Sequence, residues 1–155
     1  MVLKIGNFSN ELGNLTFFTT FNISGYLSLI SLPKKLGNLT SLNMFDISGC
    51  LSLTSLSNIL DNFSSLTSLD INEYLSLILL PNELGNLTSL TTFYIKGFSS
   101  LILSTNKIGN FTSITTFDIN AYSSRKLLLN ELSNFTSLTT FNMIIVMFKH
   151  KIIAK

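Results

Sequence analysis

The chain has 155 residues, of which 46% are hydrophobic and only 12% are charged, about half of the usual charged share. Its formal net charge of +2 is an effect of the C-terminal tail, because Lys149, Lys151 and Lys155 supply three of the ten cations. No basic stripe runs along the rest of the chain, and its longest apolar run, Met143 to Phe148, is too short to span a membrane, which argues against nucleic acid and membranes as partners.

Two further features indicate the compartment. Cys50 is the only cysteine, so an intrachain disulfide is impossible, which fits a reducing environment. The first residues, Met1–Asn7, lack the apolar stretch of a secretory signal. We therefore expect a cytoplasmic protein.

Between residues 12 and 143 a 24-residue unit begins six times, without an insertion or a deletion. The anchor triplet of the unit, most often Leu-Gly-Asn, begins at Leu12, Leu36, Leu60, Leu84, Ile108 and Leu132. A strict period of this length predicts a solenoid, in which each unit buries its apolar face by stacking on its neighbours. Residues 1–11 follow the phase of the repeat at Ile5 and Phe8 and are predicted to form a partial N-terminal cap, whereas residues 144–155 form an irregular tail, first hydrophobic and then basic.

Within each unit the spacing of the apolar residues changes from three to two. Leu84, Leu87 and Leu90 lie three apart, which favours a tight turn-like or 3₁₀ segment. Phe93 and Ile95 lie two apart, which is the alternation of a strand. The same change in every unit predicts short parallel strands near residues 19–23, 43–47, 67–71, 91–95, 115–119 and 139–143.

After each strand the pattern places one more inward side chain and then a return segment. The inward residue is aromatic or a thiol, at Tyr26, Cys50, Tyr74, Phe98 and Tyr122. We expect the Cys50 thiol to be buried and inert. Pro33 and Pro81 open their return segments, where a fixed φ suits the first turn of a short helix.

These motifs resemble the leucine-rich repeat family, in the variant that places a cysteine where others have an asparagine. Cys50 matches that variant, and the segment Leu80–Leu90 is similar to the repeats of plant intracellular disease-resistance receptors. The resemblance covers residues 8–143 and implies an α/β solenoid, a curved stack of about six 24-residue units with a parallel β-sheet on the concave face. A right-handed β-helix is the alternative if the return segments are extended rather than helical.

A column of asparagines accompanies the repeat. Its members are Asn14, Asn38, Asn62, Asn86, Asn110 and Asn134, and each begins an Asn-x-Ser/Thr sequence. The structural interpretation is a ladder that satisfies backbone groups at the turn before each strand. Glycosylation is the alternative, and it requires secretion.

Enzymatic chemistry finds little support in this sequence. The single histidine, His150, lies in the tail, and no metal-ligand pair, phosphate loop or nucleophile elbow is present. Asp46, Asp70 and Asp118 are copies of one repeat position, which indicates architecture rather than a catalytic pair. We expect a protein that is not an enzyme and uses no cofactor or metal.

The candidate partner-contacting residues are the outward positions of the strands. Asp46 and Asp70 are expected to be close neighbours, because adjacent parallel strands lie about 4.8 Å apart. The complete set is Asp46, Asp70, Asn72, Tyr94, Lys96 and Asp118. Such an acidic strip suits a basic peptide or loop, with Tyr94 and Lys96 as specific contacts. Ordinary solvated strand polarity is the alternative interpretation.

Two functional hypotheses follow from these patterns. The first is a protein-interaction module that binds an unidentified protein partner on its concave strand face. The second is a truncated or decayed repeat-array fragment with a structural role only, which self-associates through its uncapped ends.

Overall fold

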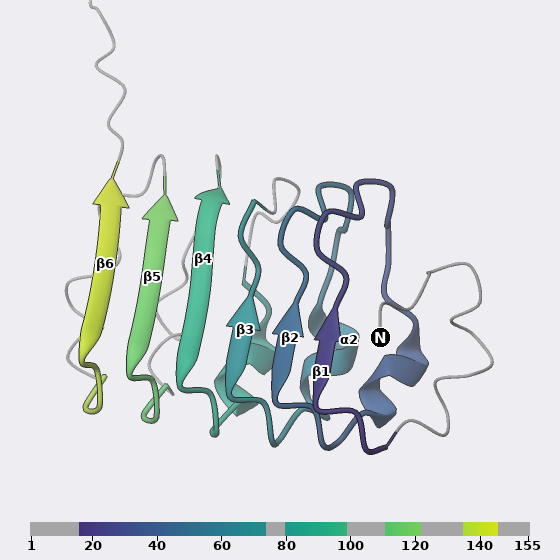
Figure 1. Ribbon diagram of the computed structural model, residues 1–155, viewed down its shortest axis with the longest axis horizontal. Helices are drawn as coiled ribbons and strands as arrows, with labels where there is room; N and C mark the ends of the chain where they lie inside the picture. Colours follow the sequence, from purple (N-terminus) through teal and green to yellow (C-terminus); the bar gives the residue numbers. More distant parts are fainter. Residues whose placement is uncertain (1–15, 74–79, 99–110, 122–134, 146–155) are drawn as a thin grey trace, which may run out of the picture.

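The computed structural model describes residues 16–73, 80–98, 111–121 and 135–145. These residues form a six-stranded sheet in which the strands follow chain order and all neighbouring pairs are parallel (Figure 1). The strands are β1 (Thr20–Asn22), β2 (Met44–Asp46), β3 (Ser68–Asp70), β4 (Thr92–Phe98), β5 (Thr116–Ala121) and β6 (Thr140–Ile145). Parallel neighbours that follow chain order need a crossover after every strand, which is the topology of a solenoid.

The register of the sheet repeats the period of the sequence. Phe21 pairs with Phe45, Leu69 pairs with Phe93, and every other described pair up to residue 96 is also 24 residues apart. The predicted parallel strands and their phase are therefore confirmed. Neighbouring turns hold equivalent side chains at equivalent positions, so the sheet presents columns of like residues.

The three C-terminal strands are longer than predicted. β4 continues to Phe98, and its pairing with β5 shifts register between Lys96 and Phe98, around Gly97 at φ 77°. A glycine in the left-handed region permits such a bulge within a strand. β5 and β6 likewise continue to Ala121 and Ile145.

The return segments contain short helices. Two 3₁₀ helices, η3 (Lys34–Asn38) and η4 (Asn82–Asn86), begin directly after Pro33 and Pro81, as predicted. A four-residue α-helix, α2 (Ser57–Leu60), occupies the segment between them. Leucines three apart favour 3₁₀ geometry, in which i and i+3 side chains eclipse. The helical part is small, and we describe the fold as a parallel β-solenoid.

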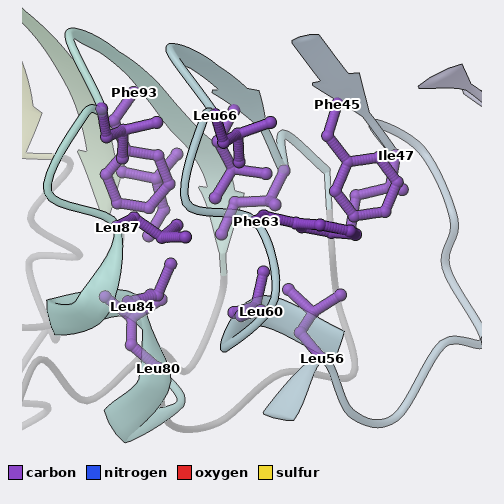
Figure 2. Packing of buried hydrophobic residues seen from close by; sticks show 14 of the residues in the cluster. Phe45, Ile47, Leu56, Leu60, Phe63, Leu66, Leu80, Leu84, Leu87 and Phe93 are labelled. Carbon is purple, nitrogen blue, oxygen red and sulfur yellow. The ribbon is translucent and has the colours of Figure 1, made fainter. Parts of the chain in front are cut away.

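The core lies between the sheet and the return segments, where apolar side chains meet (Figure 2). The inward strand residues Phe21, Phe45, Leu69, Phe93 and Phe117, together with Ile23, Ile47, Ile71, Ile95 and Ile119, are all at most 4% exposed. Phe93 and Phe117 stack with ring centroids 5.7 Å apart, and Phe45 meets Phe63 edge to face at 5.5 Å. Aromatic pairs at these distances add stability beyond area burial.

The inward position after the strand is also filled as predicted where it is described. Cys50 is fully buried and Phe98 is 1% exposed, whereas Tyr26 is partly buried. The Cys50 thiol donates a hydrogen bond to the carbonyl oxygen of Ile23 at 3.2 Å, and burial raises its pKa. A raised pKa disfavours the nucleophilic thiolate, which agrees with an inert role. Tyr74 and Tyr122 lie outside the described residues.

Burial falls at the last strand. Phe141 and Met143 on β6 are partly buried, although their counterparts one turn earlier, Phe117 and Ile119, are at most 1% exposed. Ile144 is 60% exposed, and the strand runs on through Ile145. Residues 1–11, predicted as a cap, and residues 146–155 of the predicted tail lie outside the described residues. No helix in the described segments has the length and apolarity that crossing a membrane requires.

Candidate functional site

The candidate site is the outward face of the sheet. One row of side chains crosses all six strands in register, and its members are Asn22, Asp46, Asp70, Tyr94, Asp118 and Asn142, which we name the sheet-face row. Each lies between two inward apolar residues, so the alternation of the strand turns it away from the core. Asp46 and Asp70 are direct cross-strand partners, as expected.

The Asp46 carboxylate is held by three hydrogen bonds. Asn22 Nδ2 donates to its Oδ2 at 2.7 Å. The backbone N–H and the hydroxyl of Ser48 donate to Oδ1 at 3.0 Å and 2.7 Å. The bond to the backbone of residue i+2 is an Asx-turn, which leads the chain out of the strand.

Asp70 repeats this turn on the next strand. Its Oδ1 accepts the backbone N–H of Asn72 at 2.9 Å. Burial raises the pKa of the Asp70 carboxyl above its ordinary value of 3.8, and the neighbouring Asp46 and Glu73 charges act in the same direction. The hydrogen bond from Asn72 and the Lys96 charge oppose this rise in pKa.

Tyr94, Lys96 and Asp118 form a second group on β4 and β5. Lys96 Nζ pairs with Asp118 Oδ2 at 2.5 Å, where the two side chains are 43% and 13% exposed. The same ammonium lies 6.0 Å from the centroid of the Tyr94 ring. The sequence suggested these residues singly and missed the pair. Its signal was the diagonal spacing of opposite charges on neighbouring strands.

The turns after β1, β2 and β3 enclose a shallow recess beside the sheet-face row. Its volume is about 360 Å³, and its lining residues are Ser24, Gly25, Ser48, Gly49, Asn72 and Glu73. Asn72 joins the recess to the next strand, because its Oδ1 accepts the backbone N–H of Lys96 at 2.7 Å. Of the predicted site residues, only Asn72 lines this recess.

Glu73 is the residue that the sequence analysis missed. It occupies the repeat position of Gly25, Gly49 and Gly97, and all four have positive φ, at 77°, 70° and 77° for the glycines and 58° for Glu73. Among the described residues it is the one side-chain-bearing residue in this conformation. The signal in the sequence was a glutamate at a repeat position that otherwise holds glycine in the neighbouring units.

At the opposite ends of the strands, threonine hydroxyls are used by the fold itself. Thr67, Thr91, Thr115 and Thr139 each donate an Oγ1 hydrogen bond to the carbonyl of the residue 24 positions earlier, at 3.0 to 3.1 Å. These hydroxyl protons are therefore committed to scaffold bonds.

The asparagine column lies outside the sheet face. Asn38, Asn62 and Asn86 are exposed, and Asn86 Nδ2 donates to Asp61 Oδ1 at 2.8 Å. A Cβ at Gly37 would approach Asn62 Nδ2 to 2.5 Å, so the Asn62 amide packs over Gly37. The predicted ladder involved backbone groups, whereas the hydrogen bond of Asn86 joins two side chains. Asn14, Asn110 and Asn134 lie outside the described residues.

No group of three or more His, Cys, Asp or Glu side chains that suits a metal ion occurs in the described part of the chain. The site residues in the described part of the chain carry hydrogen-bonding and charged groups, and they stand on a regular sheet. Such a face offers binding contacts.

The described fold matches solved leucine-rich-repeat structures. The ectodomain of the receptor kinase GASSHO1/SCHENGEN3 from Arabidopsis thaliana has a TM-score of 0.65 at 20% identity, covering 86% of this chain and 17% of that chain. The Arabidopsis receptor kinase HAESA has a TM-score of 0.58 at 24% identity, over 86% of this chain and 23% of that one. Internalin InlF from Listeria monocytogenes has a TM-score of 0.58 at 18% identity, over 86% and 44% of the two chains.

No family model and no curated protein matches the sequence. Likeness at these identities shows the fold, and the chain has the leucine-rich-repeat fold. It spans between 17% and 44% of the length of these three structures.

Proposed function

We propose that the chain is a non-enzymatic protein-interaction module that binds its partner on the outward face of the sheet. The observation that carries this proposal is the sheet-face row, which places hydrogen-bonding and charged side chains from six consecutive strands in one register. A partner that lies across the strands meets one such side chain about every 4.8 Å, which is the spacing of neighbouring strands.

The similar structures support a peptide or protein as the class of ligand. GASSHO1/SCHENGEN3 was solved with CASPARIAN STRIP INTEGRITY FACTOR 2, and HAESA with the peptide hormone IDA and a co-receptor. We further propose that the chain is a curved stack of six units with this sheet on the concave side. The proposed subtype is the cysteine-type, disease-resistance-like repeat, and the proposed location is the cytoplasm. Cys50 and the motif of Leu80–Leu90 support the subtype.

The row divides into two parts with different roles. Asp46 and Asp70 form an acidic part that favours a basic segment of the partner, through charge-assisted hydrogen bonds. Tyr94, with the Lys96 ammonium beside its ring, forms an aromatic anchor on the next strand. Tyrosine is enriched among residues that dominate binding energy.

A peptide-display selection on the immobilised protein tests the proposal. Peptides selected by the wild-type chain should lose at least ten-fold in affinity against the double variant Tyr94→Ala/Asp70→Ala. The variant Lys34→Ala changes an exposed residue of η3, away from the sheet face, and should bind like wild type. Equal binding to wild type and the double variant would move the site elsewhere.

A second candidate role rests on β6. Phe141 and Met143 are partly buried and Ile144 is 60% exposed, so the last strand of the sheet presents apolar surface. A chain with a structural role would use this end to stack on a second copy. Light scattering after gel filtration should then give a mass that rises with concentration, and Ile144→Lys should abolish the rise. A monomer at every concentration excludes this role.

A further inference from the structure

We infer that the recess after β1–β3 receives an arginine side chain of the partner peptide, with Glu73 as the counter-charge for its guanidinium. This inference rests on the proposed function, because the recess adjoins the sheet-face row on which the peptide would lie. It assigns a specificity-determining residue and a ligand chemistry to one end of that face.

The hydrogen-bonding groups that line the recess favour a cation. The backbone N–H groups of all six lining residues already donate within the fold: those of Ser24, Ser48 and Asn72 to the side-chain oxygens two residues earlier. Those of Gly25, Gly49 and Glu73 donate to the carbonyls of the next turn, at 2.7 to 2.8 Å.

The hydroxyl protons of the two serines also donate hydrogen bonds within the fold. Ser24 Oγ donates to Asn22 Oδ1 at 2.8 Å, and Ser48 Oγ donates to Asp46 Oδ1 at 2.7 Å. Each hydroxyl oxygen keeps lone pairs that accept hydrogen bonds. Apart from the Nδ2 group of Asn72, the described groups that line the recess therefore offer acceptors rather than free donors. An anion needs donors, whereas a guanidinium carries five donors and no acceptor.

The charges around the recess also favour a cation. Among the described residues, the nearby carboxylates of Asp46, Asp70 and Glu73 form no salt bridge; Lys96, whose charge acts on Asp70, forms its salt bridge with Asp118. Asp46 and Glu73 both act on the Asp70 carboxyl as like charges, so the three groups share one local field. A bound cation relieves this repulsion, which is complementarity of charge.

The side chain of Glu73 lies at the wall of the recess. Its Oε2 lies 3.9 Å from the position that a Cβ on Gly49 would occupy, so the carboxylate leans over the glycine at the wall of the recess. A Cβ on Gly25 would meet no atom of the described residues within 4 Å, so these residues leave the recess open at that turn. The side chain of Glu73 is exposed. A planar guanidinium that enters above Gly25 can meet a carboxylate in bidentate geometry.

The test uses N-acetyl-arginine amide as the probe and the isosteric, uncharged N-acetyl-citrulline amide as its control. In the wild-type chain, we expect the arginine probe to shift the NMR amide signals of Gly25 and Gly49 in a saturable way. The citrulline probe should bind at least ten-fold more weakly. Equal shifts with both probes, or no saturable shift with the arginine probe, would overturn the inference.

Two variants of Glu73 test its charge and its backbone conformation separately. Glu73→Gln keeps a side chain in the same conformation and should lose at least ten-fold in affinity for the arginine probe. Glu73→Gly restores the glycine of the repeat and should show the same loss, with a melting temperature equal to or above that of the wild type. Glu83→Gln removes a carboxylate from η4 and should leave binding unchanged. Wild-type affinity in both Glu73 variants contradicts the inference.

The same variants distinguish this inference from the proposed function. Display-selected peptides that are lost by Tyr94→Ala/Asp70→Ala and retained by Glu73→Gln support the sheet face and overturn the role of Glu73. Peptides that tolerate the double variant overturn the proposed function. In that case the arginine probe still decides whether the recess binds a cation.

Discussion

Replacement of one inward phenylalanine tests whether the stack is held together turn by turn. Phe117 is fully buried and lies against three rings, those of Phe93, Phe135 and Phe141, at centroid distances of 5.7, 5.5 and 5.9 Å. Phe141 occupies the same repeat position one turn later and is only partly buried. The two sites therefore have the same chemistry and the same strand position, and they differ in how completely neighbours surround them.

Phe117→Ala should lower the free energy of unfolding by about 4 kcal/mol, because truncation of a fully buried phenylalanine removes its transfer energy and leaves a cavity. Phe141→Ala should cost roughly 1 to 2 kcal/mol, because its site is already partly open and less apolar area is lost. A loss of about 4 kcal/mol is a large fraction of the stability of a small domain. The Phe117 variant should therefore be partly unfolded near room temperature if the whole chain is only marginally stable.

Urea unfolding followed by circular dichroism measures both values, and amide hydrogen exchange locates the damage. In a quasi-linear stack each turn contacts only its neighbours, so the Phe117 variant should accelerate exchange most in β4, β5 and β6. Equal losses for Phe117→Ala and Phe141→Ala, or uniform acceleration from β1 to β6, would refute the view that stability is a sum of turn-to-turn contacts.

Three further predictions concern the surface. The pKa of Asp70 is raised on folding, so its titration stabilises the fold below its ordinary pKa of 3.8, and this contribution is lost as pH rises through the raised value. Asp70→Asn should flatten that part of the pH dependence and raise the melting temperature at neutral pH; an unchanged profile would show that the carboxyl is not desolvated. A double-mutant cycle on Lys96 and Asp118 should give a coupling of about 0.5 kcal/mol that weakens in 1 M salt, because the ammonium is partly exposed. Mass spectrometry of chain isolated from its natural source should find the exposed Asn38 and Asn86 unmodified, as the proposed cytoplasmic location requires, and glycan mass on either would contradict that proposal.

The fold was largely predictable because its determinants are periodic. A spacing of two between Phe21 and Ile23, repeated every 24 residues, specifies which side chains turn inward and which strand residues pair. The strand ends were less predictable. β4 runs through Gly97 into a bulge, and a glycine in sequence is equally compatible with a turn or a bulge.

The candidate site was predictable only in part. The sheet-face row follows from strand alternation, which is why Asp46 and Asp70 were placed correctly as neighbours. The ion pair of Lys96 with Asp118 depends on the rotamers of two side chains, and sequence spacing does not determine rotamers. The recess was missed because glycines create it by lacking side chains, and their role emerges only when the left-handed turns of consecutive units are stacked.

The departures from the repeat bear on whether the chain is a working module or a decayed copy. Tyr94 replaces an acid or asparagine of the sheet-face row, Lys96 is the one basic residue of its column, and Glu73 replaces a glycine. These three residues lie together, because the backbone N–H of Glu73 donates to the carbonyl of Lys96 and the Lys96 ammonium faces the Tyr94 ring. The described inward strand positions of β1–β5 hold phenylalanine, leucine or isoleucine throughout, whereas in the sequence of the return segments Ser104 and Arg125 replace leucines of the repeat. On the described strands the exceptions lie on one outward patch, and one of them has a conformation that costs energy, which supports the proposed binding role of that face.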